Sequence, residues 1–282
     1  MNPARKYLPP LFGALAIVLA GPAVTAAVTL KPETIEAWNR YVAATEARIE
    51  RELTSDNGFL AQDFSAQPEE ARMQVLGGGI VVSEITTTDS TGKGIPIPNG
   101  TIHHWRGCIL LPGVKLEQYM NQVQNPSEEG PHQPEVLEMR ILERKPDELK
   151  FYIKITRTKF INLTYNTEHH VTYHWHGPGR ASHWSASTKI AELANAGTPE
   201  EQEKPQGQDR GFMWRLNSYW RCEEVYGGLI VEGESMLLSR QIPFGLRWLI
   251  EPLIDRAAHE MIINTLEEVK QNHTTDAIVR TH

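Results

Sequence analysis

The chain has 282 residues, of which 40% are hydrophobic, and its formal net charge is -7 at pH 7. A length of this size suits one large globular domain or two small ones. Nucleic acid and anionic membrane surfaces attract basic patches, so the acidic balance predicts no nucleic-acid partner and no charged membrane surface as a partner.

The first 27 residues have the three parts of a signal peptide. Arg5 and Lys6 give a charged start, residues 11–20 form an apolar run, and small residues continue to Ala27. The run is shorter than the roughly 20 apolar residues that span a bilayer. An uncleaved anchor is the alternative. We predict cleavage and export to the periplasm or the medium, with no transmembrane segment in the mature chain.

Residues 28–72 are predicted to form an N-terminal helix followed by a linker. The helix opens at Pro32 and runs to about Leu53, because apolar residues such as Trp38 and Tyr41 recur near the helical period. The polar stretch that follows is typical of a loop with one short helical turn.

Residues 73–272 are predicted to form the main domain, and 273–282 a flexible tail. Alternating apolar residues and strong turn signals, such as His176-Gly177-Pro178-Gly179, predict successive β-hairpins. Extended segments are expected at 101–111, 135–143, 149–156, 160–175, 180–193, 212–225 and 229–240. A polar, mobile loop is expected at 195–210.

Two helices accompany these strands. A short one is expected at 114–123, and a long one from Pro252 to Gln271 with a single apolar stripe. A stripe of this kind needs a surface to bury it. The fold class is therefore α+β: a curved antiparallel β-sheet wrapped around a long C-terminal α-helix, with an extra N-terminal helix.

This order of elements resembles the START-like (SRPBCC) helix-grip superfamily of lipid-transfer proteins and polyketide cyclases. The resemblance covers roughly residues 75–271, and the stretches 211–221 and 238–246 are similar to exported bacterial members. It implies an elongated cavity between sheet and helix for a sterol, lipid, polyketide or other apolar molecule. No cofactor is implied.

The alternation of side chains along strands suggests which residues line such a cavity. Within 212–222 the even positions are apolar, which turns Trp214 and Trp220 inward; plain core packing is the alternative. On other strands the same reasoning selects His103, Trp105, Tyr173 and Trp175. The apolar stripe of the predicted C-terminal helix adds Leu253, Ala257 and Met261.

The histidines allow a second interpretation, a zinc site formed by His174, His176 and His183. Its alternative is a solvated polar face, which we favour because no carboxylate stands at a spacing that would orient the rings. Glu232 and Glu234 share a strand face, and a solvated charged surface is expected there as well.

The sequence contains no complete catalytic constellation. A cyclase or hydrolase using His103 or His174 as acid–base remains a rival hypothesis, and an interaction module with a filled core is another. The only cysteines, Cys108 and Cys222, are either disulfide-bonded or two buried thiols. The main prediction is an exported protein that binds an apolar small molecule or lipid.

Overall fold

The computed structural model describes residues 28–128, 135–157, 163–205, 208–241, 259, 262–267 and 269–271. The predicted signal peptide, the predicted tail and most of the predicted C-terminal helix lie outside the described residues. No helix in the described part of the chain combines the length and apolar character that a membrane crossing requires.

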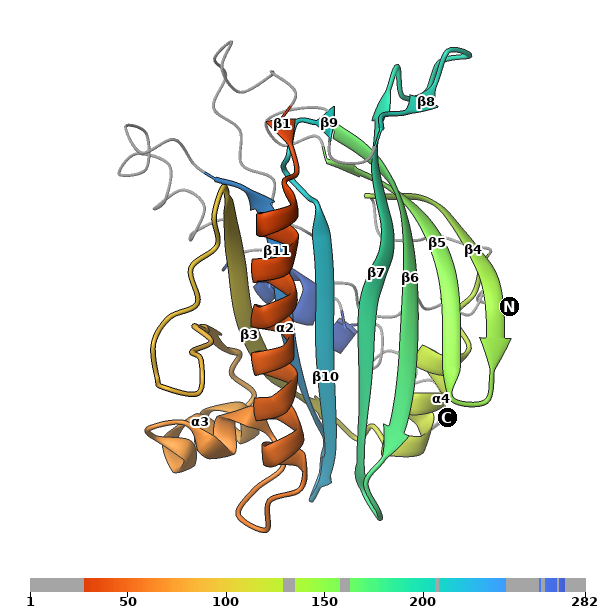
Figure 1. The fold of residues 1–282 in the computed structure, drawn as a ribbon. Helices are drawn as coiled ribbons and strands as arrows, with labels where there is room; N and C mark the ends of the chain where they lie inside the picture. The colour runs from red at the N-terminus through yellow and green to blue at the C-terminus, as the bar shows by residue number, and fades with distance from the viewer. Residues whose placement is uncertain are drawn as a thin grey trace, which may run out of the picture.

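A single large antiparallel sheet forms the body of the described protein (Figure 1). Its strands follow the order β2-β3-β11-β10-β7-β6-β5-β4, and the short strand β8 adds to β7. Their bounds are β2 Val81–Glu84, β3 Gly100–Pro112, β4 Val136–Lys145, β5 Glu148–Arg157, β6 Leu163–Trp175, β7 Arg180–Ala194, β10 Arg215–Val225 and β11 Gly228–Arg240. The predicted antiparallel sheet is therefore confirmed, with its hairpins close to the expected positions.

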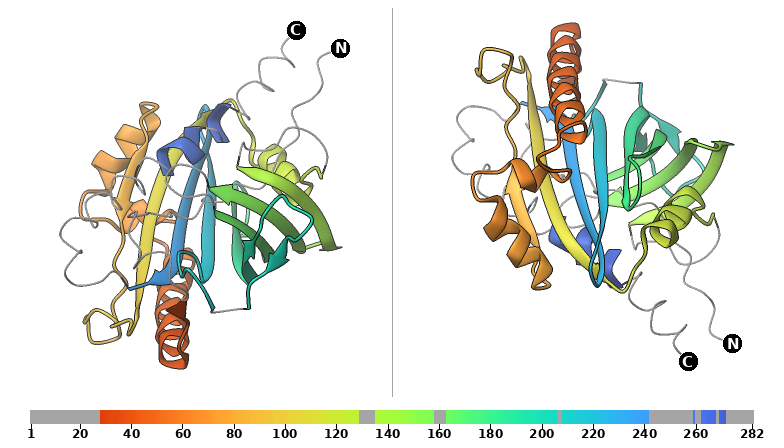
Figure 2. Two further views of the ribbon diagram at one scale, coloured as in Figure 1. Left: turned by 90° about the horizontal axis from the view of Figure 1, so that it is seen from above. Right: turned by 90° about the horizontal axis from the view of Figure 1, so that it is seen from below.

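Side chains alternate between two buried faces of this sheet. We call the inner face the one that carries Ile109, Trp220 and Tyr173, which belong to the largest apolar cluster. Helix α4 (Leu116–Gln124) and the described C-terminal residues Ile262, Leu266 and Val269 belong to the same cluster. The sheet curls toward this side (Figure 2).

Helix α2 (Pro32–Leu53) covers the opposite, outer face across β3, β11 and β10 (Figure 2). Pro32 suits the first helical turn, where its missing N–H costs nothing. Trp38, Tyr41 and Ile49 recur on one side of the helix and pack against outer-face residues such as Met236. The predicted N-terminal helix is thus confirmed, and it serves as the cover of a second core.

The region after α2 is more ordered than a linker. It contains the short helix η1 (Ala61–Phe64) and helix α3 (Pro68–Leu76), which pack beside α2 and β3. The segment predicted as a mobile loop contains β8 (Gln202–Glu203) and β9 (Gln208–Asp209), and β9 pairs with β1 (Val28–Thr29). Buried Glu192 fixes that segment by binding Lys204 and Arg210.

The long C-terminal helix is not shown. The described helical residues are 259, 262–267 and 269–271, which form a short helix. It lies directly on β3, because a Cβ atom added to Gly107 would approach Ile262 and Leu266 within 2.6 Å and 2.5 Å. Glycine therefore permits this close approach of helix and strand.

Candidate ligand-binding face

The centre of the inner face is a cluster of aromatic rings around His183. The imidazole stacks on the Trp220 indole, with centroids 5.7 Å apart and planes at 8°. Tyr119 of α4 and Tyr173 of β6 approach the same imidazole at 6.3 Å and 5.9 Å. Strand pairing explains this arrangement, since both Trp220 and Tyr173 are cross-strand partners of His183.

His183 is a polar residue in an apolar environment. Burial lowers the pKa of its imidazole to about 3, so the ring is neutral at physiological pH. Its Nε2 atom has no hydrogen-bond partner among the described residues. Buried polar atoms are almost always paired, so an atom without a partner calls for an explanation.

Two further polar atoms of the inner face also lack a hydrogen-bond partner among the described residues. Ser185 follows His183 on β7, and His169 lies across the β6–β7 pair beside Ser187. Within the described part of the chain, neither Ser185 Oγ nor His169 Nδ1 has a hydrogen-bond partner. The three residues therefore form a polar seam, His183–Ser185–His169, along an otherwise apolar face.

A β-bulge adjoins this seam. Glu168 pairs with Lys189 while His169 pairs with Ser187, so one extra residue of β7 is accommodated there. Bulges re-aim side chains and are common beside binding and active sites. The alternation of side chains along β7 therefore shifts by one residue between Ser187 and Lys189.

His103 and Trp105 lie on the inner face of β3, the strand next to the edge strand β2. His103 shares a hydrogen bond of 3.0 Å with Ser239 Oγ, and burial lowers the pKa of His103 to about 4. Trp105 is half-buried and meets the ring of His259 edge-on at 6.4 Å. The predicted pair is therefore placed on one face, beside the C-terminal helix.

The other residues predicted to line the cavity do not all lie on the buried inner face. Trp220 and Tyr173 are buried on the inner face, and Tyr173 donates a hydrogen bond to the Val123 carbonyl at 2.8 Å. Trp175 is 49% exposed at the end of β6. Leu253, Ala257 and Met261 lie outside the described residues.

Trp214 is not beside Trp220, contrary to the prediction from strand alternation. It precedes β10, which begins at Arg215, so the alternation does not extend to it. Its indole N–H donates to Asp209, and its ring packs in the outer-face cluster with Trp38.

The predicted alternative of a zinc site is not assembled. His174 lies on the outer side against Trp184, and His176 binds Ser182 Oγ at 2.8 Å. His183 is on the inner face, because β6 and β7 pair Tyr173 with His183. Among the described residues, no three His, Cys, Asp or Glu side chains are placed to hold a metal ion.

Cys108 and Cys222 are separate buried thiols. Cys222 packs in the inner cluster and Cys108 in an outer one with Phe59. The sheet itself lies between them, which excludes the predicted alternative of a disulfide in this structure.

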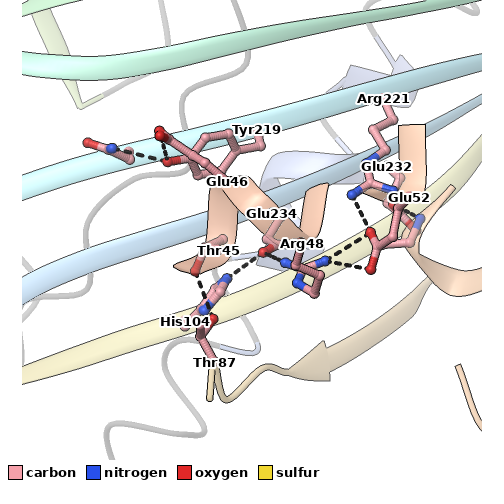
Figure 3. A network of polar contacts seen from close by, with 12 residues as sticks. Thr45, Glu46, Arg48, Glu52, Thr87, His104, Tyr219, Arg221, Glu232 and Glu234 are labelled. Carbon is pink, nitrogen blue, oxygen red and sulfur yellow. Dashed lines mark hydrogen bonds and ion pairs between the residues drawn. The ribbon is translucent and has the colours of Figure 1, made fainter. Parts of the chain in front are cut away.

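The outer face contains a network of charged residues that the sequence did not reveal (Figure 3). Glu234 accepts hydrogen bonds from Arg48 of α2 and from His104 Nε2, the latter at 2.7 Å. The other ring nitrogen of His104 bonds to Tyr41 Oη at 2.9 Å. Burial raises the pKa of Glu234, but His104, Arg48 and Arg221 together bring it down to about 2.

The network continues along α2 toward its C-terminal end (Figure 3). Arg221 donates to Glu52 at 2.5 Å and to the Phe59 carbonyl at 3.0 Å. Glu232 accepts the backbone N–H groups of Ala61 and Gln62 at 2.6 Å and 2.9 Å. These bonds fasten α2 and η1 to the sheet.

Glu232 and Glu234 are consequently not part of a solvated charged surface, which corrects the prediction. Both are almost fully buried. The prediction was wrong because the partners are remote: η1 is about 170 positions from Glu232, and Arg48 is 186 positions from Glu234.

The fold is similar to known structures at low sequence identity, while no family model and no curated protein matches the sequence. A STAR-related lipid transfer protein from Xanthomonas axonopodis is 14% identical with a TM-score of 0.43; the match covers 67% of this chain and 98% of that chain. Human STARD10 is 10% identical with a TM-score of 0.37, over 75% of this chain and 84% of that one.

The Zhui aromatase/cyclase from Streptomyces sp. R1128 is 7% identical with a TM-score of 0.36; the match covers 64% of this chain and 97% of that chain. Two of these three structures are lipid-transfer or START-related proteins by name, and the third is an aromatase/cyclase.

Proposed function

We propose that this protein binds an apolar small molecule or lipid on the inner face of its sheet. One observation carries the proposal: an extensive apolar face contains the polar seam His183–Ser185–His169, and each of these residues has one side-chain polar atom without a partner among the described residues. Ligand sites are mostly apolar with a few polar groups that fix orientation, and this face has that composition.

The ligand in this proposal is held by burial rather than by charge. Trp105 and Trp220 supply large apolar surfaces, and each aromatic side chain buries about 150–250 Å² when fully covered. His183 and His169 are neutral, since burial lowers their pKa values to about 3 and about 4. The described C-terminal helical residues Ile262 and Leu266 contribute to the apolar cluster of this face.

The test is to purify the full chain from its native host without detergent, extract it with organic solvent and identify bound molecules by mass spectrometry. We expect one apolar species near stoichiometric amount. Trp105→Ala should lose most of it, whereas Trp184→Ala, on the outer face, should retain it. An empty wild-type extract, or equal loss in both variants, would count against the proposal.

We further propose that the protein acts after export. Residues 1–27 have the composition of a signal peptide, and an apolar molecule in an aqueous compartment needs a carrier. N-terminal sequencing of the protein from the periplasm or medium tests this. We expect the mature chain to begin at Ala27 or Val28; a cytoplasmic protein beginning at Met1 would refute it.

A further inference from the structure

The hydrogen-bond network around His169 identifies which ring nitrogen carries the proton. His169 is 3% exposed, and its ring stacks on Phe151 with centroids 5.2 Å apart and planes at 18°. Its Nε2 lies 3.1 Å from Thr167 Oγ1. The Thr167 hydroxyl in turn donates its hydrogen to the Ile153 carbonyl at 3.1 Å.

A hydroxyl group has only one hydrogen to donate. Since Thr167 donates to Ile153, it can only accept from His169, so Nε2 carries the imidazole proton. Burial lowers the pKa of His169 to about 4, which keeps the ring neutral with a single N–H. Nδ1 is therefore an acceptor without a proton, and it has no partner among the described residues.

Only a hydrogen-bond donor can satisfy this nitrogen. A carbonyl, ester or ether oxygen would place one lone pair against another. A carboxylate would also need a cation, but the two cations of β7 are engaged elsewhere: Arg180 binds Glu223, and Lys189 binds Glu203. The hydroxyl of Ser185 and Nε2 of His183 continue the same neutral seam.

We propose that the ligand is an apolar alcohol, a hydrocarbon skeleton whose hydroxyl group donates a hydrogen bond to Nδ1 of His169. The inference rests on the proposed function and narrows it from apolar molecules in general to those with a hydroxyl donor. Free fatty acids and their esters are discriminated against.

Three probes with the same sixteen-carbon chain separate these chemistries: 1-hexadecanol, methyl palmitate and palmitate at pH 7.5. Their affinities are measured on the full chain by competition with a fluorescent apolar probe. We expect hexadecanol to bind at least tenfold tighter than either of the others. Equal binding of all three overturns this inference but leaves the proposed function standing, whereas binding of none overturns both.

Variants test whether His169 is responsible. In His169→Phe we expect the preference for hexadecanol over methyl palmitate to fall below threefold, with methyl palmitate affinity kept within twofold. His170→Phe is the matched control, because the adjacent His170 faces the outer side near Glu148. A preference that survives in His169→Phe, or is lost equally in His170→Phe, overturns the proposal.

Thr167→Val provides a second variant that keeps the histidine. Without the Thr167 acceptor, the imidazole proton is free to move to Nδ1, so we expect methyl palmitate to bind more tightly and the preference to fall below threefold. Nitrogen NMR of the wild-type protein should show Nε2 protonated and Nδ1 bare. A protonated Nδ1 in the wild type, or an unchanged preference in Thr167→Val, overturns the assignment.

Discussion

The same strands form both faces of the sheet, but the polar side chains of the two faces differ in their hydrogen-bond partners. On the outer face, Glu234, Arg48 and His104 bind one another, so each charged group has partners within the chain. On the inner face, His183 and His169 are neutral rings that keep a nitrogen without a partner among the described residues. The charged groups of the outer face are therefore paired within the chain, whereas the inner face carries neutral imidazole nitrogens without a partner among the described residues.

This contrast explains the function of α2. Its polar groups Arg48 and Glu52 bind the sheet residues Glu234 and Arg221. Ion pairs of this kind depend strongly on geometry and therefore specify one position of the helix. These contacts hold α2 on the outer face, opposite the face on which we propose that the ligand binds.

The largest expected effect is on the outer face. Arg221→Met removes the cation that binds Glu52 and the Phe59 carbonyl. Glu52 then keeps only Arg48, and the buried Phe59 carbonyl loses its donor. We therefore expect the free energy of unfolding at pH 7 to fall by about 3 kcal/mol in urea denaturation, the low end for breaking a buried ion pair.

Two controls accompany Arg221→Met. Arg221→Met with Glu52→Gln should regain part of the loss, since both charges are then removed. Lys115→Met breaks the exposed pair with Glu224 and should have a far smaller effect. A loss for Arg221→Met no larger than that for Lys115→Met would mean that the outer network does not hold α2.

A second effect comes from the neutral imidazoles of the inner face. The pKa of His183 is lowered to about 3 in the folded chain, whereas the unfolded value is near 6.5. Below pH 6.5 this histidine binds a proton in the unfolded chain but not in the folded chain. The free energy of unfolding therefore falls as the pH drops toward about 3. At pH 5 this costs about 2 kcal/mol.

His183→Phe removes that titration while keeping an aromatic ring against Trp220. We expect urea denaturation between pH 7 and pH 5 to show about 2 kcal/mol less loss of stability in the variant than in the wild type. His174→Phe, on the exposed outer side, is the control and should follow the wild type. Parallel profiles of wild type and His183→Phe would contradict neutral burial of His183.

The sequence predicted the features that depend on local periodicity. The hairpins, the helix from Pro32 and the inward side chains of Trp220 and Tyr173 all follow from patterns within one element. Trp214 was placed on the wrong face because alternation holds only inside a strand, and β10 begins one residue later. A strand boundary is therefore enough to reverse a side chain.

Features that depend on pairing between distant elements could not be predicted. The face of His183 is set by its register with Tyr173, and a shift of one residue would have turned it outward. The burial of Glu232 depends on η1, and nothing near Glu232 in the sequence indicates that partner. The polar seam depends on the pairing of β6 with β7, which places His169 beside Ser187.

The smallest expected effect concerns the helix on the inner face. In Gly107→Ala the new methyl group would lie 2.5 Å from Leu266 and 2.6 Å from Ile262. The Leu266 contact is with a flexible side-chain end, but the Ile262 contact is with a branch methyl group held close to the helix backbone, so the helix itself must shift slightly. We expect a loss of about 1 kcal/mol in the free energy of unfolding, at the lower end for overpacking. Backbone amides of residues 262–267 should exchange faster with solvent, because the helix is pushed off β3.

Gly94→Ala is the matched control, since no atom lies within 4 Å of the added methyl group. It should leave both stability and exchange unchanged. If Gly107→Ala behaves like Gly94→Ala, the helix does not press on β3 and does not close the inner face. If it loosens the helix and also weakens retention of the ligand, then the helix that covers the apolar face also holds its occupant, while α2 on the other side does not.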